Sequence, residues 1–272
     1  MIDLSLWYLF PLSVLISTVA MMSGIGGAAM FSPVFMLLLG LDPISAFAIG
    51  LFVELFGFTS GLIGYWKRKL IDFTLVRKII IVTIPSVVGG IIIALFLPLI
   101  ILKLTLAVLL LYLSISFLIQ KKKCNPKHPA CTQELNHIEK YDYTRVPTSI
   151  IASSFLGGLL FGAISSGLGE LNEYNFLKKL KLPIPIASGT SVFLVAISAF
   201  VGILIHATVS FVSGSTLPFS EMITILLFVL PGVVLGAQVG VLLSQKVNLE
   251  HMGRFIGGLF LVLFVMVLVT VF

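Results

Sequence analysis

ISAFAIGLFVELFGFTSGLIGYW, residues 44–66, is an almost uninterrupted apolar stretch with a single charged residue, Glu54. It exceeds the roughly 20 residues that an α-helix needs to cross a hydrocarbon core about 30 Å thick. Its apolar residues do not alternate as those of a barrel strand do. The stretch therefore predicts a transmembrane α-helix.

The composition of the whole chain agrees with this prediction. Of the 272 residues, 58% are hydrophobic and only 10% are charged, and the mean hydropathy is +1.17. A soluble domain has about a quarter charged residues, so this chain needs lipid as its solvent, and we expect no nucleic-acid partner. No Lys or Arg precedes the first apolar run and no small-residue cleavage pattern follows it, so we expect that run to be retained as structure.

Further apolar runs lie on both sides of residues 44–66 and have the same cadence in the two halves of the chain. They span residues 6–22, 28–39, 79–97 and 104–119, then 148–165, a mixed piece at 170–182, and 186–205, 222–243 and 255–272. We predict an all-α polytopic membrane protein with a first membrane repeat at residues 1–119, a cytoplasmic linker loop at 120–147 and a second membrane repeat at 148–272.

The matching cadence indicates an internal duplication. At a nearly constant offset, four pairs of residues coincide: Gly24 with Gly167, Gly26 with Gly169, Gly61 with Gly202, and Pro85 with Pro231. Because the same offset superposes the breaks in hydropathy, we predict two related repeats, each an interrupted, hairpin-like helix followed by three transmembrane helices.

Basic residues predict how the repeats are oriented, since cytoplasmic loops collect Lys and Arg. If each interrupted segment crossed the membrane once, the repeats would be parallel and six basic residues would lie outside: Lys103, Lys178, Lys179, Lys181, Lys246 and Arg254. If each is instead a hairpin, the repeats are inverted, and only Lys103 of the 17 basic residues lies outside. We predict inverted repeats in the cytoplasmic membrane, with the basic loops inside and both termini outside.

Two glycine-rich turns interrupt the predicted hairpins, Ser23–Gly27 in the first half and Ser166–Gly169 in the second. Irregular backbone within a membrane leaves polar groups that protein or a water-filled cavity must satisfy. The half-helices that start near Ala28 and Glu170 would direct their free N–H groups toward the middle of the protein, where two such helix starts could bind one anion. The alternative is that these glycines only allow close helix packing.

The order of these motifs resembles the sulfite exporter TauE/SafE family over nearly the whole chain. The resemblance rests on Ser23-Gly24-Ile25-Gly26-Gly27, Pro33, Ala46–Leu51, Gly61 with Gly64, the basic turn with Ile71-Asp72, and Pro85 with Gly89. It implies a secondary transporter that exports sulfite or another small sulfur-containing or organic anion. The second half departs from the family pattern, because Glu170 and Glu173 follow its glycine turn and would repel an anion unless protonated or turned aside.

Residues at or near the two turns are the predicted ligands of the anion. They are Ser23, Gly24, Gly26, Gly27, Ser166, Gly167, Gly169, Asn172 and Ser191. Three carboxyl groups at membrane depth are candidates for proton coupling, because burying a charge there is costly: Glu54, Glu170 and Glu173. Glu54 could take up a proton as the anion leaves. The alternatives are a protonated Glu54 hydrogen-bonded between helices, and a solvated helix arm for the other two.

The remaining motifs allow a second function. Cys124 and Cys131 lie in the polar loop, and a membrane thiol or electron-transfer protein that uses them is the alternative to a transporter. Their spacing is a poor match to zinc sites, and no nucleotide-binding motif is present, so we predict no metal, no cofactor and no enzymatic activity. The glycines of Gly232-x-x-x-Gly236-x-x-x-Gly240 could serve packing within the chain or a homodimer interface.

Overall fold

The predicted all-α class is confirmed. A computed structural model describes the whole chain except residues 1–3, 24–26, 120–145, 214–218, 244–248 and 272. After a 3-10 turn at Leu4–Tyr8, the helices are α1 Leu9–Ser23, α2 Ala28–Leu38, α3 Pro43–Lys67, α4 Phe73–Phe96, α5 Leu99–Ile119, α6 Thr148–Ile164, α7 Leu168–Lys179, α8 Ile184–Ser213, α9 Phe219–Leu243 and α10 Leu249–Val271.

Each apolar run of the sequence became a helix, and several helices begin earlier than their apolar run. α4 begins at Phe73 rather than at Ile79 because the Asp72 carboxylate accepts hydrogen bonds from Thr74 N and Leu75 N, both at 3.0 Å. The same type of N-cap starts α3, where Asp42 accepts from Ile44 N at 3.0 Å and precedes a proline. Capping by aspartate satisfies N–H groups that the first helical turn leaves free.

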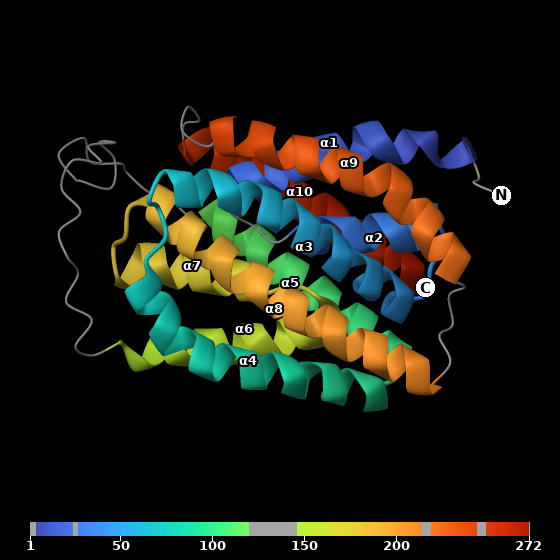
Figure 1. Cartoon of the computed structure of the whole chain (residues 1–272), viewed down its shortest axis with the longest axis horizontal. Coiled ribbons are helices and arrows are strands. Elements are labelled where there is room, and N and C mark those ends of the chain that lie inside the picture. Colours follow the sequence, from blue (N-terminus) through green and yellow to red (C-terminus); the bar gives the residue numbers. More distant parts are fainter. Residues whose placement is uncertain (1–3, 24–26, 120–145, 214–218, 244–248, 272) are drawn as a thin grey trace.

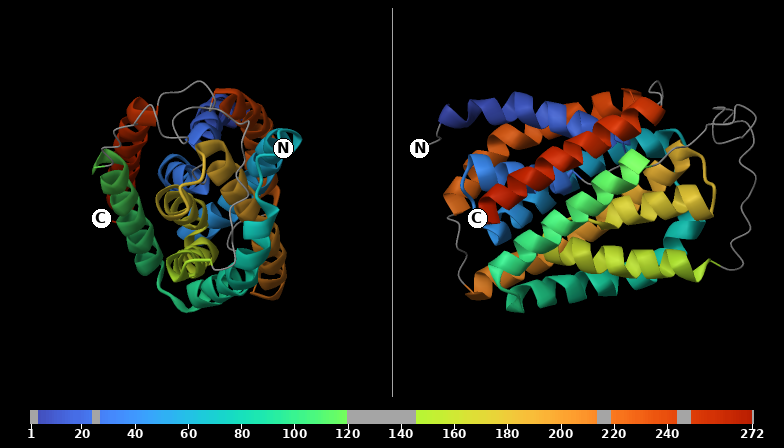
Figure 2. Two further views of the ribbon diagram at one scale, coloured as in Figure 1. Left: turned by 90° about the vertical axis from the view of Figure 1, so that its left-hand side faces the viewer. Right: turned by 180° about the vertical axis from the view of Figure 1, so that it is seen from behind.

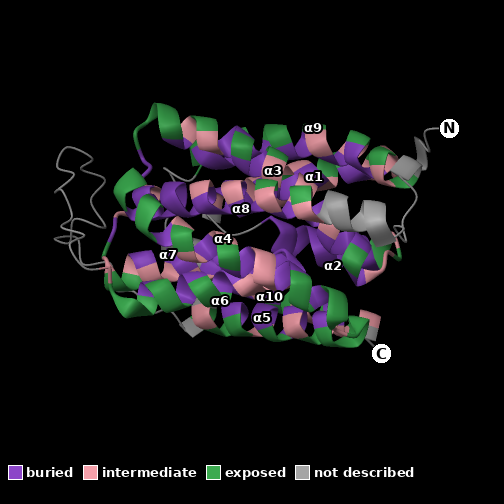
Figure 3. Ribbon diagram, turned by 60° about the horizontal axis from the view of Figure 1, so that its bottom comes forward, coloured by how far each residue is buried: buried purple, intermediate pink, exposed green. Residues whose placement is uncertain are grey.

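Several helices have the length and apolar composition of membrane spans. Within the described residues these are Pro43–Lys67, Phe73–Phe96, Leu99–Ser116, Pro185–Ile205 and Glu221–Leu243. Their outward faces are strongly apolar: Ile81 is 72% exposed and Phe96 is 83% exposed. Figure 3 shows the exposed residues on the outer faces of the bundle and the buried ones facing inward. Such a surface suits lipid rather than water, so this is a multi-pass membrane protein.

The two ends of the bundle hold different connections (Figure 1). α1 begins, and α10 ends, at one end, which also holds the α2–α3 and α4–α5 connections. The opposite end holds the α3–α4 connection, the start of α6 and the end of α7. The pair α1–α2 thus starts and finishes at one end, and the pair α6–α7 starts and finishes at the other. The basic residues Lys67, at the end of α3, and Arg68 and Lys69, which follow it, lie at the same end as Lys178 and Lys179 of α7.

The helix–helix contacts also correspond between the two halves of the chain. α1 packs along α9, and α6 packs along α4; α2 packs on α3, and α7 packs on α8; α3 packs on α8, and α5 on α10. Exchanging the first five helices for the last five maps these pairs onto one another. Two related halves would give this pairing, and the repeats, their inversion across a membrane and the side on which the termini lie stay predictions.

The glycine stripe of α9 serves packing within the chain. A Cβ at Gly236 would lie 3.0 Å from Ser17 Cβ, and one at Gly240 would lie 2.9 Å from Met21 Cβ, both on α1. Ser17 Oγ donates a hydrogen bond of 2.8 Å to Val233 O across the same contact. Small residues therefore bring the backbones of α1 and α9 together, as is typical of membrane helix pairs.

The short helices α2 and α7 lie inside a ring of longer helices, as the view along the bundle axis in Figure 2 shows. All residues from Ala28 to Met36 of α2 are buried. In α7 the buried residues include Leu168, Gly169, Glu170 and Asn172. Both chain breaks therefore direct a helix start into the interior of the protein.

Candidate functional site

The first break lies between α1 and α2. Gly24 and Gly26 lie outside the described residues, and so does the side chain of Ser23. Gly27 is described, and its carbonyl accepts from Met30 N and Phe31 N, both at 3.0 Å, which closes the first turn of α2. The N–H of Ala28 has no partner within the helix and donates to Glu54 Oε1 of α3 at 3.0 Å. The carboxyl of Glu54 thus occupies the start of α2.

The second break lies between α6 and α7 and depends on left-handed backbone. Ser165 has φ +55° and Gly167 has φ +108°. The N–H of Gly167 donates to Glu170 Oε2 at 3.0 Å, and Ser166 Oγ donates to Glu170 Oε1 at 3.4 Å. Ser165 Oγ donates to Phe47 O of α3 at 3.0 Å, which fixes the turn against the first half. A glutamate carboxyl therefore occupies the start of α7 as well.

The conformation of Gly167 makes its replacement a sharp test of the turn. In Gly167→Ala the alanine would have to adopt φ +108°, a backbone conformation that residues with a side chain rarely adopt. Its Cβ would also lie 3.1 Å from Leu160 Cβ. We expect a loss of stability of about 1–3 kcal/mol, measured by thermal unfolding of the purified protein in detergent. Gly89→Ala is the matched control, since its Cβ would make only an ordinary 3.5 Å contact with Leu159. Equal unfolding temperatures for the two variants would contradict the left-handed backbone at Gly167.

Three carboxyl groups are buried around these helix starts. Glu54 is 1% exposed, Glu170 is 2% exposed and Glu173 is 6% exposed. The alternative of a solvated arm for Glu170 and Glu173 is therefore wrong, because α8 and α6 cover that face of α7. Glu173 accepts a hydrogen bond from Ser188 Oγ of α8. Glu170 lies close enough to interact electrostatically with both other carboxyls.

Two further predicted ligands hold α7 in place. Asn172 is fully buried, and its Oδ1 accepts from Ser154 Oγ of α6 at 2.7 Å. Ser191 Oγ of α8 donates to Gly169 O at 2.9 Å. Ser191 thus satisfies a backbone carbonyl in this conformation, while the amide nitrogen of Asn172 has no protein partner.

Apolar clusters cover the buried carboxyls toward both ends of the bundle. Toward the end where α3 begins lie Phe31 and Phe35 of α2 and Phe47 of α3. Toward the opposite end lie Tyr65 of α3 and Phe176 of α7. These five side chains are at most 3% exposed, and Glu54 and Glu170 are 1% and 2% exposed, so these two carboxyl-bearing residues have almost no contact with outside water in this conformation.

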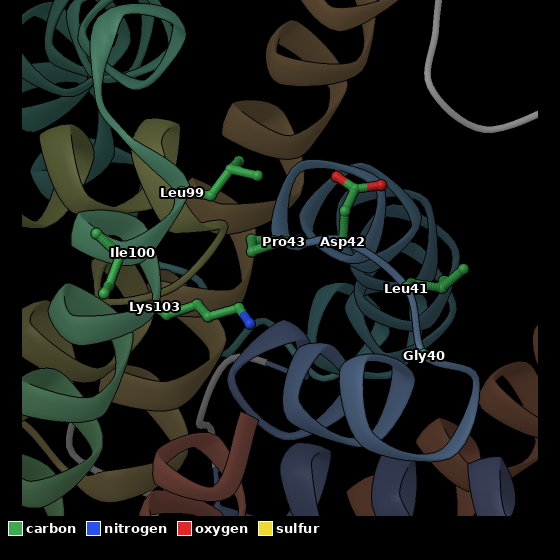
Figure 4. Close-up of a pocket in the computed structure, with 7 residues that line it drawn as sticks. All are labelled: Gly40, Leu41, Asp42, Pro43, Leu99, Ile100 and Lys103. Carbon is green, nitrogen blue, oxygen red and sulfur yellow. The ribbon is translucent and has the colours of Figure 1, made fainter. Parts of the chain in front are cut away.

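A separate pocket of about 340 Å³ lies at the end of the bundle where α3 and α5 begin (Figure 4). It is lined by Gly40, Leu41, Asp42, Pro43, Leu99, Ile100 and Lys103. Its charged groups are engaged: the Asp42 carboxylate caps α3, and Lys103 Nζ donates to Thr270 O of α10 at 2.5 Å. None of the predicted anion ligands lines this pocket.

In the described residues, no group of three or more His, Cys, Asp or Glu side chains could hold a metal ion. Cys124 and Cys131 lie outside those residues. The described centre combines N–H and O–H donors with carboxyl groups.

Fold and centre together define a polytopic α-helical membrane protein with two interrupted helices that start in its interior. The model of the sulfite exporter TauE/SafE family matches residues 9–267, so the chain belongs to this family of membrane transporters. No curated protein and no solved structure matches this chain.

Proposed function

We propose that this protein is a secondary transporter that exports a small oxyanion, sulfite or a related sulfur-containing or organic anion, across the cytoplasmic membrane. The observation that carries the proposal is the meeting of each interrupted helix with a buried glutamate inside a chain of the sulfite exporter family. Helix starts offer N–H groups and a positive dipole end to an anion, and in this conformation glutamate carboxyl groups of the protein occupy those N–H groups.

Proton movement in the opposite direction follows from that occupancy. A substrate anion can bind the start of α2 only if the Glu54 carboxyl leaves it, because both need the N–H of Ala28. When the anion has left, the carboxyl returns to a buried position with no cationic partner among the described residues, and a proton neutralises it there. Proton uptake by Glu54 as the anion leaves, and proton release as the next anion binds, would couple the two fluxes in opposite directions.

Alternating access supplies the transport cycle. The apolar cluster of Phe31, Phe35 and Phe47 closes one end, and that of Tyr65 and Phe176 closes the other. Opening one cluster at a time would expose the centre to one side of the membrane and then to the other. The closed conformation described here corresponds to the occluded step of such a cycle.

Flux of labelled sulfite in proteoliposomes tests the proposal, with the membrane potential clamped at zero and sulfate, thiosulfate and acetate as competitors. We expect saturable sulfite flux that is absent from protein-free liposomes. The double variant Cys124→Ser with Cys131→Ser should transport at the wild-type rate, because the proposed path does not use the thiols. Loss of flux in that variant would favour the thiol function, and no flux of any of these anions would contradict an oxyanion transporter.

A further inference from the structure

Four buried side-chain atoms in the described part of the chain have no hydrogen-bond partner: Ser32 Oγ, Glu54 Oε2, Asn172 Nδ2 and Ser198 Oγ. They belong to α2, α3, α7 and α8, the two short helices and the long helices on which these pack. Buried polar atoms without a partner are rare and cost free energy, so their gathering on these four helices calls for an explanation.

The two serines differ from most other buried hydroxyls of this protein. Hydroxyl groups in membrane helices usually donate to a carbonyl one turn earlier. Thr83 does so to Ile79 O at 3.0 Å, and Ser86 to Thr83 O at 2.8 Å. Ser32 and Ser198 are both 0% exposed and make no such bond. Their hydroxyls are therefore available to a ligand.

Ser32 lies one turn of α2 after Ala28, whose N–H donates to Glu54. A Cβ at Gly50 of α3 would lie 3.1 Å from Ser32 Oγ and 3.2 Å from Ala28 Cβ, so both residues of α2 face the same part of α3. Glu54 follows Gly50 by one turn and binds Ala28 N through Oε1. Because Gly50 has no side chain, the backbone of α3 can lie close to the hydroxyl of Ser32.

Ser198 approaches the same level from α8. A Cβ at Gly202 would lie 3.4 Å from Leu51 Cδ1, and one at Gly189 would lie 3.2 Å from Tyr65 Cδ1, so α3 and α8 run antiparallel. Ser198 precedes Gly202 by one turn, and Glu54 follows Leu51 by about one turn. Because α3 and α8 are antiparallel, one turn back along α8 and one turn forward along α3 lead in the same direction. Ser198 therefore lies at the level of Glu54 along the bundle.

We infer that Ser32 and Ser198 are substrate-contacting residues whose hydroxyl groups donate hydrogen bonds to the transported oxyanion beside Glu54. The inference rests on the proposed function and adds ligands that the sequence pattern did not single out. An oxyanion offers several oxygen acceptors in fixed directions, which suits the Ala28 N–H and the Ser32 hydroxyl on α2 together with the Ser198 hydroxyl on α8.

Sulfite transport by Ser32→Ala and Ser198→Ala tests this site. Because a hydrogen bond to a charged group is lost, we expect each variant to raise the KM for sulfite about tenfold. Ser198→Thr, which keeps a hydroxyl, should stay close to wild type. Ser86→Ala is the matched control: its hydroxyl is equally buried but bonded to Thr83 O, so its KM should not change.

The outcomes separate this inference from the proposed function. If wild type transports sulfite and both alanine variants have the KM of Ser86→Ala, the two serines are not ligands and only this inference falls. If wild type transports none of sulfite, sulfate, thiosulfate and acetate, the proposed function falls and this site with it. Thermal unfolding of each variant in detergent shows whether a change in KM results from misfolding. If an alanine variant unfolds early, the KM of Ser198→Thr, which keeps the hydroxyl, decides the role of that group.

Discussion

Glu54→Gln should abolish the ability of a pH difference to drive anion accumulation. If one proton moves against one anion at zero membrane potential, a pH difference of two units sustains an anion ratio of about 100, since each unit is worth about 1.36 kcal/mol. Antiport sends protons from the acidic to the alkaline side, so the anion accumulates on the acidic side. Glutamine can still accept the hydrogen bond from Ala28 N, but it cannot take up the proton.

The measurement is the steady-state sulfite ratio across proteoliposomes with an acidic exterior and the potential clamped. We expect about 100 for wild type and about 1 for Glu54→Gln, with downhill exchange of sulfite retained. Glu221→Gln is the control, because Glu221 is an exposed carboxyl at the start of α9. A ratio in Glu54→Gln that equals that of Glu221→Gln would remove Glu54 from the coupling, and accumulation on the alkaline side would show that proton and anion move together.

The helices could be predicted from the sequence because lipid-spanning segments are long and apolar. Their starts were less accurate where the capping group is polar: Arg77 and Lys78 interrupt the apolar pattern, yet the Asp72 carboxylate starts α4 before them, at Phe73. A hydropathy pattern records the apolar part of a helix, whereas a cap depends on one side chain and two N–H groups.

The candidate site could be predicted only in part. The glycine turns and Glu54 stood out because glycine clusters and charges are unusual in apolar runs. That Glu54 binds the start of α2, and Glu170 the start of α7, could not be predicted, because the first contact joins residues of different helices and the second depends on a left-handed turn. Ser32 was missed because its lack of a partner is a property of the packed structure and not of the sequence around it.

Gly162→Ala should destabilise the protein by about 3 kcal/mol, because the added Cβ would overlap backbone atoms that have no room to move. On α4 this Cβ would contact Val87 O, and it would lie 2.8 Å from Ile91 N and 3.0 Å from Gly90 Cα. Flexible side chains could turn away from a new methyl group. These backbone atoms cannot, so α4 and α6 would have to separate. Their contact also positions the Ser165–Gly167 turn, which follows directly at the end of α6.

Gly258→Ala is the matched control, since the same methyl group on α10 would meet nothing within 4 Å. Alanine favours a helix over glycine by about 1 kcal/mol, so this control should be neutral or slightly stabilising. Thermal unfolding in detergent should therefore show a midpoint for Gly162→Ala about 10 °C below that of Gly258→Ala. Equal midpoints would mean that α4 and α6 are not in backbone contact, and the placement of the α6–α7 turn against α3 would then lose its support.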